Sequence, residues 1–233
     1  MFTKIDLSQA YAQLELDEES KRLVAINTHR GLFVYNRLPY GISSAPGIFQ
    51  QMIEQTLAGI KGVAIFLDDI LITGRNKLEH LNTLRIVFEK LKHCGLKLRK
   101  DKCDFFRSEI TYLGHTINKD GLNTSPDKIE AILNAKMPSN VTELKAFLGL
   151  INYYGKFIPN LSSKLHALYF LLKKDVVWNW NDTCQDVFNS VKNELTSHKI
   201  LVHYNPKLPV TLACDASAYG LGAVISHRYL SKW

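Results

Sequence analysis

The chain has 233 residues, of which 46% are hydrophobic and 22% are charged. This balance is typical of an ordinary globular protein and excludes disordered, collagen-like and fibrous chains. The four cysteines form no CxxC pair and no Cys/His cluster, so neither a zinc site nor a disulfide framework is indicated. Two aspartates interrupt the longest apolar stretch, 63–72, and no charged and then apolar leader opens the chain. We therefore expect no membrane partner and no secretion signal.

The chain is basic overall, with a formal net charge of +7 at pH 7 and a pI near 9.1. Basic residues are concentrated between Arg85 and Arg107, where eight Lys or Arg accompany three acidic residues. Because Lys and Arg neutralise phosphates, this charge favours nucleic acid as the partner. A solvated helix face is an equally good interpretation of the same segment.

The opening of the chain is rich in short apolar segments separated by polar turns. They predict strands over 2–7, 14–16, 23–26 and 32–34. Apolar residues then recur at helical spacing over 48–57, with Ser44 as a candidate cap and Pro46 in the first turn. This pattern predicts a helix with one apolar face.

Residues 63–72 are apolar on both sides of Asp68 and Asp69. The pattern predicts a β-hairpin with the acid pair as its two-residue tip. A second helix is expected over 81–91, ending near Gly95.

The second half of the chain changes to helical patterns, several of them opened by capping residues such as Asn140 with Glu143. The expected elements are a hairpin over 110–117 around Gly114, helices over 125–137, 140–159, 165–172 and 182–195, and strands over 209–214 and 221–225.

Three carboxylates are candidates for chemistry. Asp6 ends an apolar strand, while Asp68 and Asp69 lie at the apolar hairpin. An Asp-Asp pair between two strands usually serves only to form the turn. However, like charges on an apolar sheet repel each other and stay ionised best beside a cation. Hard ions such as Mg²⁺ prefer oxygen ligands and keep positions open for phosphate oxygens, so this set suits phosphoryl transfer with two metal ions.

Seven segments stand out in chain order: FTKIDLSQAY (2–11), LPYGISSAPGIFQ (38–50), FLDD (66–69), GLKLRKDKC (95–103), YLGH (112–115), ELKAFLGLINYYGKFIP (143–159) and ACDASAYGLGAVIS (213–226). In this order they resemble the motifs of reverse transcriptases, most closely those of gypsy/Ty3-type long-terminal-repeat retrotransposons. The resemblance covers essentially the whole chain.

The resemblance implies an α+β fold, the polymerase palm of the right-hand reverse transcriptases. It places a palm with partial fingers (about 13–37) over 1–121, a helical thumb over 122–174, a connection over 175–208 and a truncated ribonuclease H-like start over 209–233.

The implied function is RNA-directed DNA polymerase, which adds deoxynucleotides (dNTPs) to a primer 3′-hydroxyl on an RNA or DNA template. Asp6 and Asp68 become the ligands of two Mg²⁺ ions, which Mn²⁺ could replace, together with the backbone carbonyl of Leu7. Asp69 becomes the third acid. Catalysis of this kind consists mostly of positioning and charge stabilisation.

The resemblance also assigns residues to the nucleotide. Tyr11 corresponds to the aromatic residue that leaves no room for a 2′-hydroxyl, although a packed core aromatic is the alternative. The N–H groups of Gln9 and Ala10 would face the phosphates. Gly41 would permit close approach to a base, and Tyr40 stands where relatives often carry Phe or Gln.

Lys102 matches the lysine proposed to protonate the leaving pyrophosphate, with a surface lysine as the alternative. Residues 112–115 match a hairpin that grips the primer. Tyr153, Tyr154 and Phe157 lie in the thumb, where most aromatics are expected to be core.

The resemblance is incomplete at both ends of the sequence. Asp215 matches the first carboxylate of ribonuclease H, but the chain stops at Trp233 before the later acids, so we expect a remnant without nuclease activity. Only five residues precede Asp6, so by resemblance we expect most of the fingers, with their phosphate clamps, to be absent from this sequence.

Two other functions stay open: a non-catalytic nucleic-acid-binding remnant, and an unrelated metal-dependent phosphohydrolase. By resemblance, further partners are the other parts of a Pol polyprotein, namely the rest of ribonuclease H and an integrase. The expected location is the cytoplasm or a virus-like particle.

Overall fold

The computed structural model describes residues 1–196, 200–217 and 220–227. Contacts divide the chain into two units, Met1–Tyr112 and Leu113–Trp233, each considered separately below. Within the described ranges, no helix combines the length and the apolar character needed to cross a membrane.

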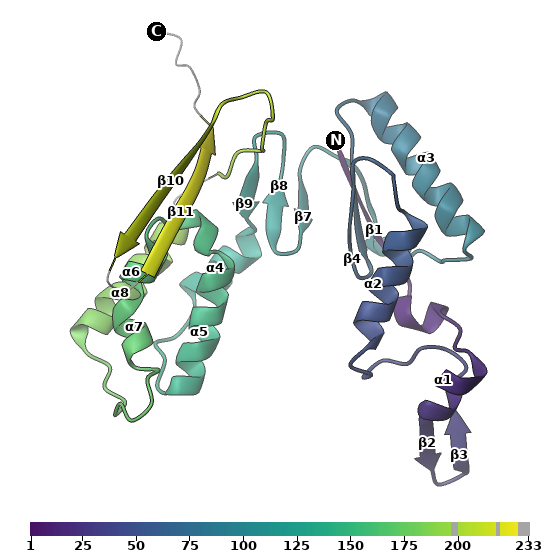
Figure 1. The fold of residues 1–233 in the computed structure, drawn as a ribbon, viewed down its shortest axis with the longest axis horizontal. Helices are drawn as coiled ribbons and strands as arrows, with labels where there is room; N and C mark the ends of the chain where they lie inside the picture. The colour runs from purple at the N-terminus through teal and green to yellow at the C-terminus, as the bar shows by residue number, and fades with distance from the viewer. Residues whose placement is uncertain (197–199, 218–219, 228–233) are drawn as a thin grey trace. The chain divides into compact units, whose positions relative to one another are not determined.

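A four-stranded antiparallel sheet forms the centre of the first unit (Figure 1). Its strands, in spatial order, are β4 (Val63–Phe66), β5 (Asp69–Thr73), β1 (Phe2–Asp6) and β6 (Asp104–Arg107). β1 thus lies in the sheet between β6 and the β4–β5 hairpin, and it pairs with β5 although more than sixty residues separate the two strands. This pairing brings the two sequence regions with aspartates together.

Two helices, α2 (Ala45–Thr56) and α3 (Lys77–His93), pack on one face of this sheet. Ile5, Ile70 and Ile72 point toward them and are fully buried. Alternation along each strand therefore sends residues 2, 4 and 6 of β1 to the opposite face. Both predicted helices are confirmed, but the Ser44 side chain makes no cap hydrogen bond.

The segment between β1 and α2 differs from the prediction. It contains a 3₁₀ turn η1 (Ala10–Gln13), helix α1 (Glu18–Leu23) and the hairpin of β2 (Ala25–Thr28) and β3 (Gly31–Val34). The strand predicted over 14–16 is reduced to a single bridge at Glu15, and Leu23 belongs to a helix. The reason is the cap at Asp17, whose Oδ1 accepts a hydrogen bond from the Ser20 N–H at 2.7 Å.

Two short elements complete the first unit: η2 (Lys100–Lys102), which precedes β6, and β7 (Ile110–Tyr112). β7 ends where the predicted turn around Gly114 begins, and the second unit starts just beyond it.

The second unit has its own core. Its elements are the hairpin of β8 (His115–Ile117) and β9 (Leu122–Thr124), then α4 (Pro126–Leu133), α5 (Val141–Tyr153), η3 (Gly155–Phe157), α6 (Leu161–Lys164), α7 (His166–Phe170) and α8 (Asp182–Thr196). α5 and α8 face each other through Phe147 and Phe188, whose ring centroids are 4.6 Å apart. The predicted cap of α5 is confirmed, because Asn140 Oδ1 accepts the Glu143 N–H at 2.9 Å.

The described chain closes with the hairpin of β10 (Val210–Ser217) and β11 (Gly220–His227). Both strands were expected from the sequence. Ala218 and Tyr219 of the ACDASAYGLGAVIS segment, and the end of the region predicted over 209–233, lie outside the described residues.

Candidate active site on the central sheet

Asp6 and Asp69 lie directly opposite each other on neighbouring strands, β1 and β5. Opposed residues of an antiparallel pair present their side chains on the same face, with Cβ atoms roughly 5 Å apart. Asp68 precedes Asp69 at the hairpin turn, and its carbonyl accepts the Leu7 N–H at 3.1 Å. The sheet therefore brings the three predicted carboxylates to one end of β1 and β5.

The hairpin tip is one residue earlier than predicted. Phe66 pairs with Asp69, so Leu67 and Asp68 form the two-residue turn. The prediction that Asp68 and Asp69 form the tip is wrong because β1 supplies a second partner for Asp69, which extends β5 by one residue. Leu67 takes a positive φ of 53°, which is unusual for a residue with a branched side chain.

Burial dominates the electrostatics of Asp69. Its pKa is raised above the ordinary range, first by burial and then by the charges of Asp68 and Asp6, while Lys4 lowers it. The Lys4 ammonium lies 3.7 Å from Asp69 Oδ1. The carboxylates thus repel one another, as the sequence analysis expected, and one cation already partly offsets that repulsion.

Lys4 was not predicted as a site residue, although the strand pattern could have indicated it. It lies two residues before Asp6 in an alternating strand, and so on the same face. Cys103 was also missed: the Asp6 N–H donates to its Sγ at 3.5 Å. No local pattern predicts that contact, because 97 residues separate the two.

The donors predicted for a metal ion are all oxygens, namely the three carboxylates and the Leu7 carbonyl. Across the described ranges, no three His, Cys, Asp or Glu side chains are arranged to hold one metal ion by themselves. This donor set fits Mg²⁺, which typically takes one or two carboxylates and completes its shell with water and phosphate oxygens.

The predicted nucleotide residues Tyr11 and Tyr40 come together, with ring centroids 5.0 Å apart. Tyr11 also contacts Phe49 of α2, at 5.6 Å. The pKa of the Tyr11 hydroxyl is raised by burial, then by the charge of Asp68 and by Tyr40. Tyr11 therefore lies near the carboxylates, although it is not a fully buried core residue.

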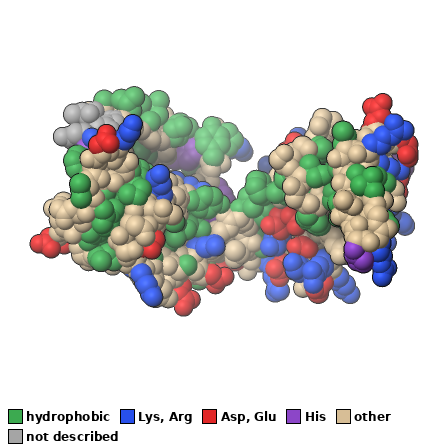
Figure 2. All heavy atoms as spheres, turned by 90° about the horizontal axis from the view of Figure 1, so that it is seen from below, with side chains coloured by type: hydrophobic (Ala, Val, Ile, Leu, Met, Phe, Trp, Pro, Cys, Tyr) green, Lys and Arg blue, Asp and Glu red, His purple; other side chains and the backbone are tan. Residues whose placement is uncertain are grey.

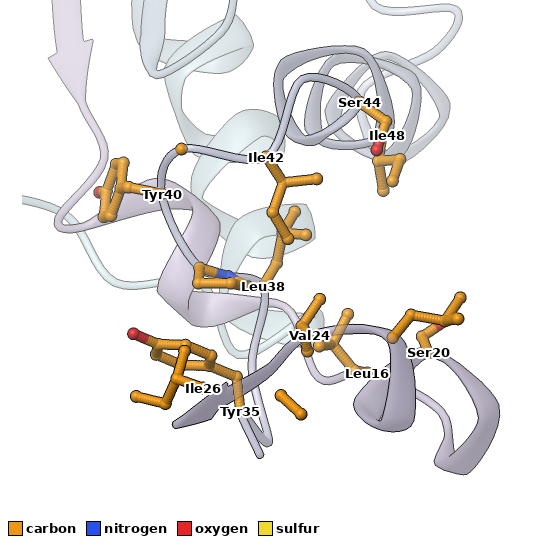
Figure 3. A pocket seen from close by; sticks show the side chains of 14 residues that line it. Leu16, Ser20, Val24, Ile26, Tyr35, Leu38, Tyr40, Ile42, Ser44 and Ile48 are labelled. Atoms are coloured by element: carbon orange, nitrogen blue, oxygen red, sulfur yellow. The ribbon is translucent and has the colours of Figure 1, made fainter. Parts of the chain in front are cut away.

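A cavity of about 470 Å³ lies beside Tyr40 (Figure 3). Apolar side chains line most of it, among them Leu38 and Ile48, and Tyr40 stands at its edge. Gly41 has a φ of 92° and open space where a Cβ would stand. Glycine is thus required there by the backbone conformation, and the contact with a base stays a prediction.

The remaining predicted residues of this unit follow β1 or lie beside it. Gln9 has a left-handed backbone (φ 47°, ψ 54°) and Ala10 begins η1, so the chain turns sharply just after Leu7. Lys102 ends η2, and its side chain is exposed. Within the described residues, no ion pair joins Lys102 to one of the three aspartates.

Tyrosines surround the YLGH segment. Tyr112 donates its hydroxyl to the Asp69 carbonyl at 3.4 Å, and burial, with the charge of Asp69, raises the pKa of Tyr112 to about 12. In the second unit, Tyr153 and Tyr154 donate to the carbonyls of Leu113 and Gly114 at 2.6 and 3.1 Å. These two tyrosines anchor the turn, and Tyr154 is core, as predicted for most thumb aromatics.

Asp215 is the one predicted carboxylate of the second unit. It lies exposed in β10, opposite Gly222 of β11. Its role as part of a nuclease stays a prediction.

The basic segment 85–107 runs from the second half of α3 through η2 into β6. Arg99 and Arg107 pair with the acidic residues Asp101 and Asp104. On the face shown in Figure 2, Lys and Arg side chains lie beside acidic and apolar ones. The basic charge of that face is therefore interspersed with acidic side chains.

Two family models match the chain. The model described as reverse transcriptase (RNA-dependent DNA polymerase) matches residues 1–117, and that of the RNase H-like domain found in reverse transcriptase matches residues 180–232.

Curated relatives include the Tf2-3 and Tf2-7 transposon polyproteins of Schizosaccharomyces pombe. They are 37% and 36% identical to this chain over 231 residues, which is 98% of the chain. The chain spans 17% of the length of these relatives.

Solved structures with the same fold include a foamy viral protease-reverse transcriptase in complex with double-stranded DNA. One such structure gives a TM-score of 0.88 at 25% identity and covers 97% of this chain and 40% of that one. Another, in complex with an RNA/DNA hybrid, gives 0.83 at 24% identity and covers 97% of this chain and 33% of that one. The α+β fold is thereby confirmed, and the chain belongs to the reverse transcriptase family of RNA-dependent DNA polymerases.

Proposed function

We propose that this chain catalyses template-directed addition of deoxynucleotides to a primer 3′-hydroxyl with Mg²⁺, as the polymerase part of a retrotransposon polyprotein. The observation that carries the proposal is the β1–β5 register, which sets Asp6 opposite Asp69 with Asp68 at the adjoining turn. Family membership supports the same reaction.

The residues at the ends of β1 and β5 would hold the metal ions of that reaction. Asp6, Asp68 and the Leu7 carbonyl would hold two metal ions, Mg²⁺ or Mn²⁺. When bound, such ions neutralise phosphate oxygens and lower the pKa of the attacking hydroxyl. Asp69 adds negative charge beside them, moderated by Lys4.

The nucleotide would contact the turn that follows β1. The N–H groups of Gln9 and Ala10 would donate to its phosphates. Tyr11 would exclude a 2′-hydroxyl, and Tyr40 would support the ring of Tyr11. Lys102 would give a proton to the leaving pyrophosphate.

The partners proposed are an RNA or DNA template with its primer, dNTPs, and the remaining parts of a Pol polyprotein. Relatives that are themselves polyproteins support the last of these. The proposed location, the cytoplasm or a virus-like particle, rests on the retrotransposon relationship.

Primer extension on an RNA template tests the proposal. Wild-type chain with Mg²⁺ is expected to extend the primer, and Asp68→Asn to lose roughly 10²–10³-fold in rate because a metal-binding charge is gone. Asp120→Asn, an exposed aspartate of the second unit, is the matched control and keeps wild-type rate. Absence of primer extension by both the wild-type chain and Asp68→Asn would contradict the proposed polymerase activity.

A nucleic-acid-binding protein without catalysis is the second candidate, favoured by the basic segment 85–107. Such binding would weaken steeply with salt and ignore both Mg²⁺ and nucleotide identity. Retention of a labelled primer-template at 50 mM salt, with no extension by the same sample, would favour it over polymerase activity.

A further inference from the structure

Gln50 of helix α2 clasps the hairpin turn that carries Asp68. Its Oε1 accepts the Leu67 N–H at 2.6 Å, and its Nε2 donates to the Ile65 carbonyl at 3.2 Å. The same Nε2 donates to Glu54 Oε1 at 2.6 Å, one helical turn further along α2. Since one end of the amide meets a donor and the other meets two acceptors, only one orientation of the Gln50 amide satisfies all three contacts.

The turn needs such a partner. Leu67 has a left-handed backbone (φ 53°), which a branched residue adopts only when its surroundings enforce it. Gln50 holds the peptide that precedes Leu67, and the Leu7 N–H holds the carbonyl of Asp68 at 3.1 Å. The two turn residues are thus fixed between two hydrogen-bonded peptides, and the direction of the Asp68 side chain follows from them.

Gln50 stands on a rigid element. Its neighbour Phe49 and Ile53, one turn later, are fully buried beneath the sheet, so α2 cannot shift without opening the core. α2 lies alongside β4 (Figure 1), whose last residue begins the turn. Gln51, by contrast, is exposed.

We infer that Gln50 is a positioning residue: it holds the Leu67–Asp68 turn so that the Asp68 carboxylate is presented beside Asp6. Its hydrogen bond to the Leu67 N–H means that it would act through the backbone of the turn. The inference rests on the proposed polymerase function for its consequence, but the clasp itself is a property of the chain alone.

The experiment compares three variants of the full chain. Gln50→Met keeps length and flexibility but removes all three hydrogen bonds, Glu54→Gln weakens only the support of the amide, and Gln51→Met is the matched control on the same helix. Exchange of the Leu67 amide hydrogen is measured by NMR, Mn²⁺ affinity by titration, and kcat and KM by primer extension.

Gln50→Met is expected to speed Leu67 amide exchange roughly 10-fold and to weaken Mn²⁺ binding by about the same factor, since the Leu67 N–H loses its hydrogen-bond acceptor. kcat should fall more than the KM for dNTP. Glu54→Gln should give a smaller change of the same kind, and Gln51→Met none.

Two outcomes overturn the inference: unchanged Leu67 exchange in Gln50→Met, or faster exchange with wild-type Mn²⁺ affinity, which would make the clasp merely structural. A wild-type chain that does not extend primers would contradict the proposed function, yet exchange and Mn²⁺ titration would still decide the role of Gln50.

Discussion

Asp68 and Asp69 are neighbours in the sequence but occupy different environments. Asp68 is exposed at the turn, whereas Asp69 lies in β5, half-buried and opposite Asp6. Burial raises the pKa of Asp69, so the folded chain holds its proton more tightly than the unfolded chain does. As pH rises from the ordinary value of 3.8 through the raised pKa of Asp69, this residue therefore lowers the free energy of unfolding.

Asp69→Asn should consequently stabilise the fold while it impairs catalysis. At pH 7 we expect the free energy of unfolding to rise by roughly 1 kcal/mol, because a repelled and partly desolvated charge is removed. Urea unfolding at pH 7 and below pH 3.8 checks this, since the gain should vanish where Asp69 is protonated in both states. A variant less stable than wild type at pH 7 would contradict it.

Tyr11 is held between Tyr40 and Phe49, near the charge of Asp68. If its ring excludes the 2′-hydroxyl, Tyr11→Ala should lower the preference for deoxynucleotides over ribonucleotides roughly 10- to 100-fold. Steady-state incorporation of dATP and ATP measures the ratio. Tyr11→Phe, which keeps the ring, is the control; an equal loss of preference in both variants would assign the effect to the hydroxyl.

At the scale of elements, α3 is attached to the sheet by a buried polar contact. His80 is fully buried and its Nε2 lies 2.7 Å from Thr3 Oγ1 of β1. Burial, and then the positive charge of the chain's amino terminus, lowers the pKa of His80 below 6.5. A lowered pKa means that stability is fully present above pH 6.5 and is lost as pH falls toward the folded-state value.

The wild-type free energy of unfolding should therefore decrease between pH 7.5 and 5.5, and His80→Leu should reduce that decrease. The variant is expected to be less stable at pH 7.5 by about 1 kcal/mol, because the contact with Thr3 is lost. Urea titrations at the two pH values measure both effects. His29→Leu, at an exposed position, should leave the slope unchanged; a slope in His80→Leu equal to wild type would refute the assignment.

Elements also differ in how well they could be predicted. α5 was predicted because its cap at Asn140 and its apolar spacing agree, and both are local. α1 was missed because Leu23 was assigned to a strand by its apolar neighbours, while the cap at Asp17 was overlooked. The hairpin tip was misplaced because its length depends on β1, which is remote in the sequence.

At the scale of the molecule, the two units have separate hydrophobic cores. All three tryptophans follow residue 113 in the sequence, and Trp178 and Trp180 pack against the core of the second unit. Tryptophan fluorescence therefore reports on that unit.

Ile151→Ala, at a fully buried position of the second core, should lower the stability measured by tryptophan fluorescence by about 2–5 kcal/mol. Ile53→Ala, equally buried in the first core, is the matched control and should leave that transition in place while it lowers the stability of the first unit. Equal shifts of the fluorescence transition in both variants would show that the units unfold as one.

The sequence by itself determined the family and the order of most helices and strands, and it supplied the three aspartates as candidates, because motifs, caps and apolar periodicity are local properties. Only the tertiary structure decided which residues share a face. The partnership of Asp6 with Asp69, the ion pair of Lys4 and the clasp of Gln50 all depend on pairing between segments far apart in the chain. Strand register and helix packing set those distances, and neither can be read from the residues on either side of a position.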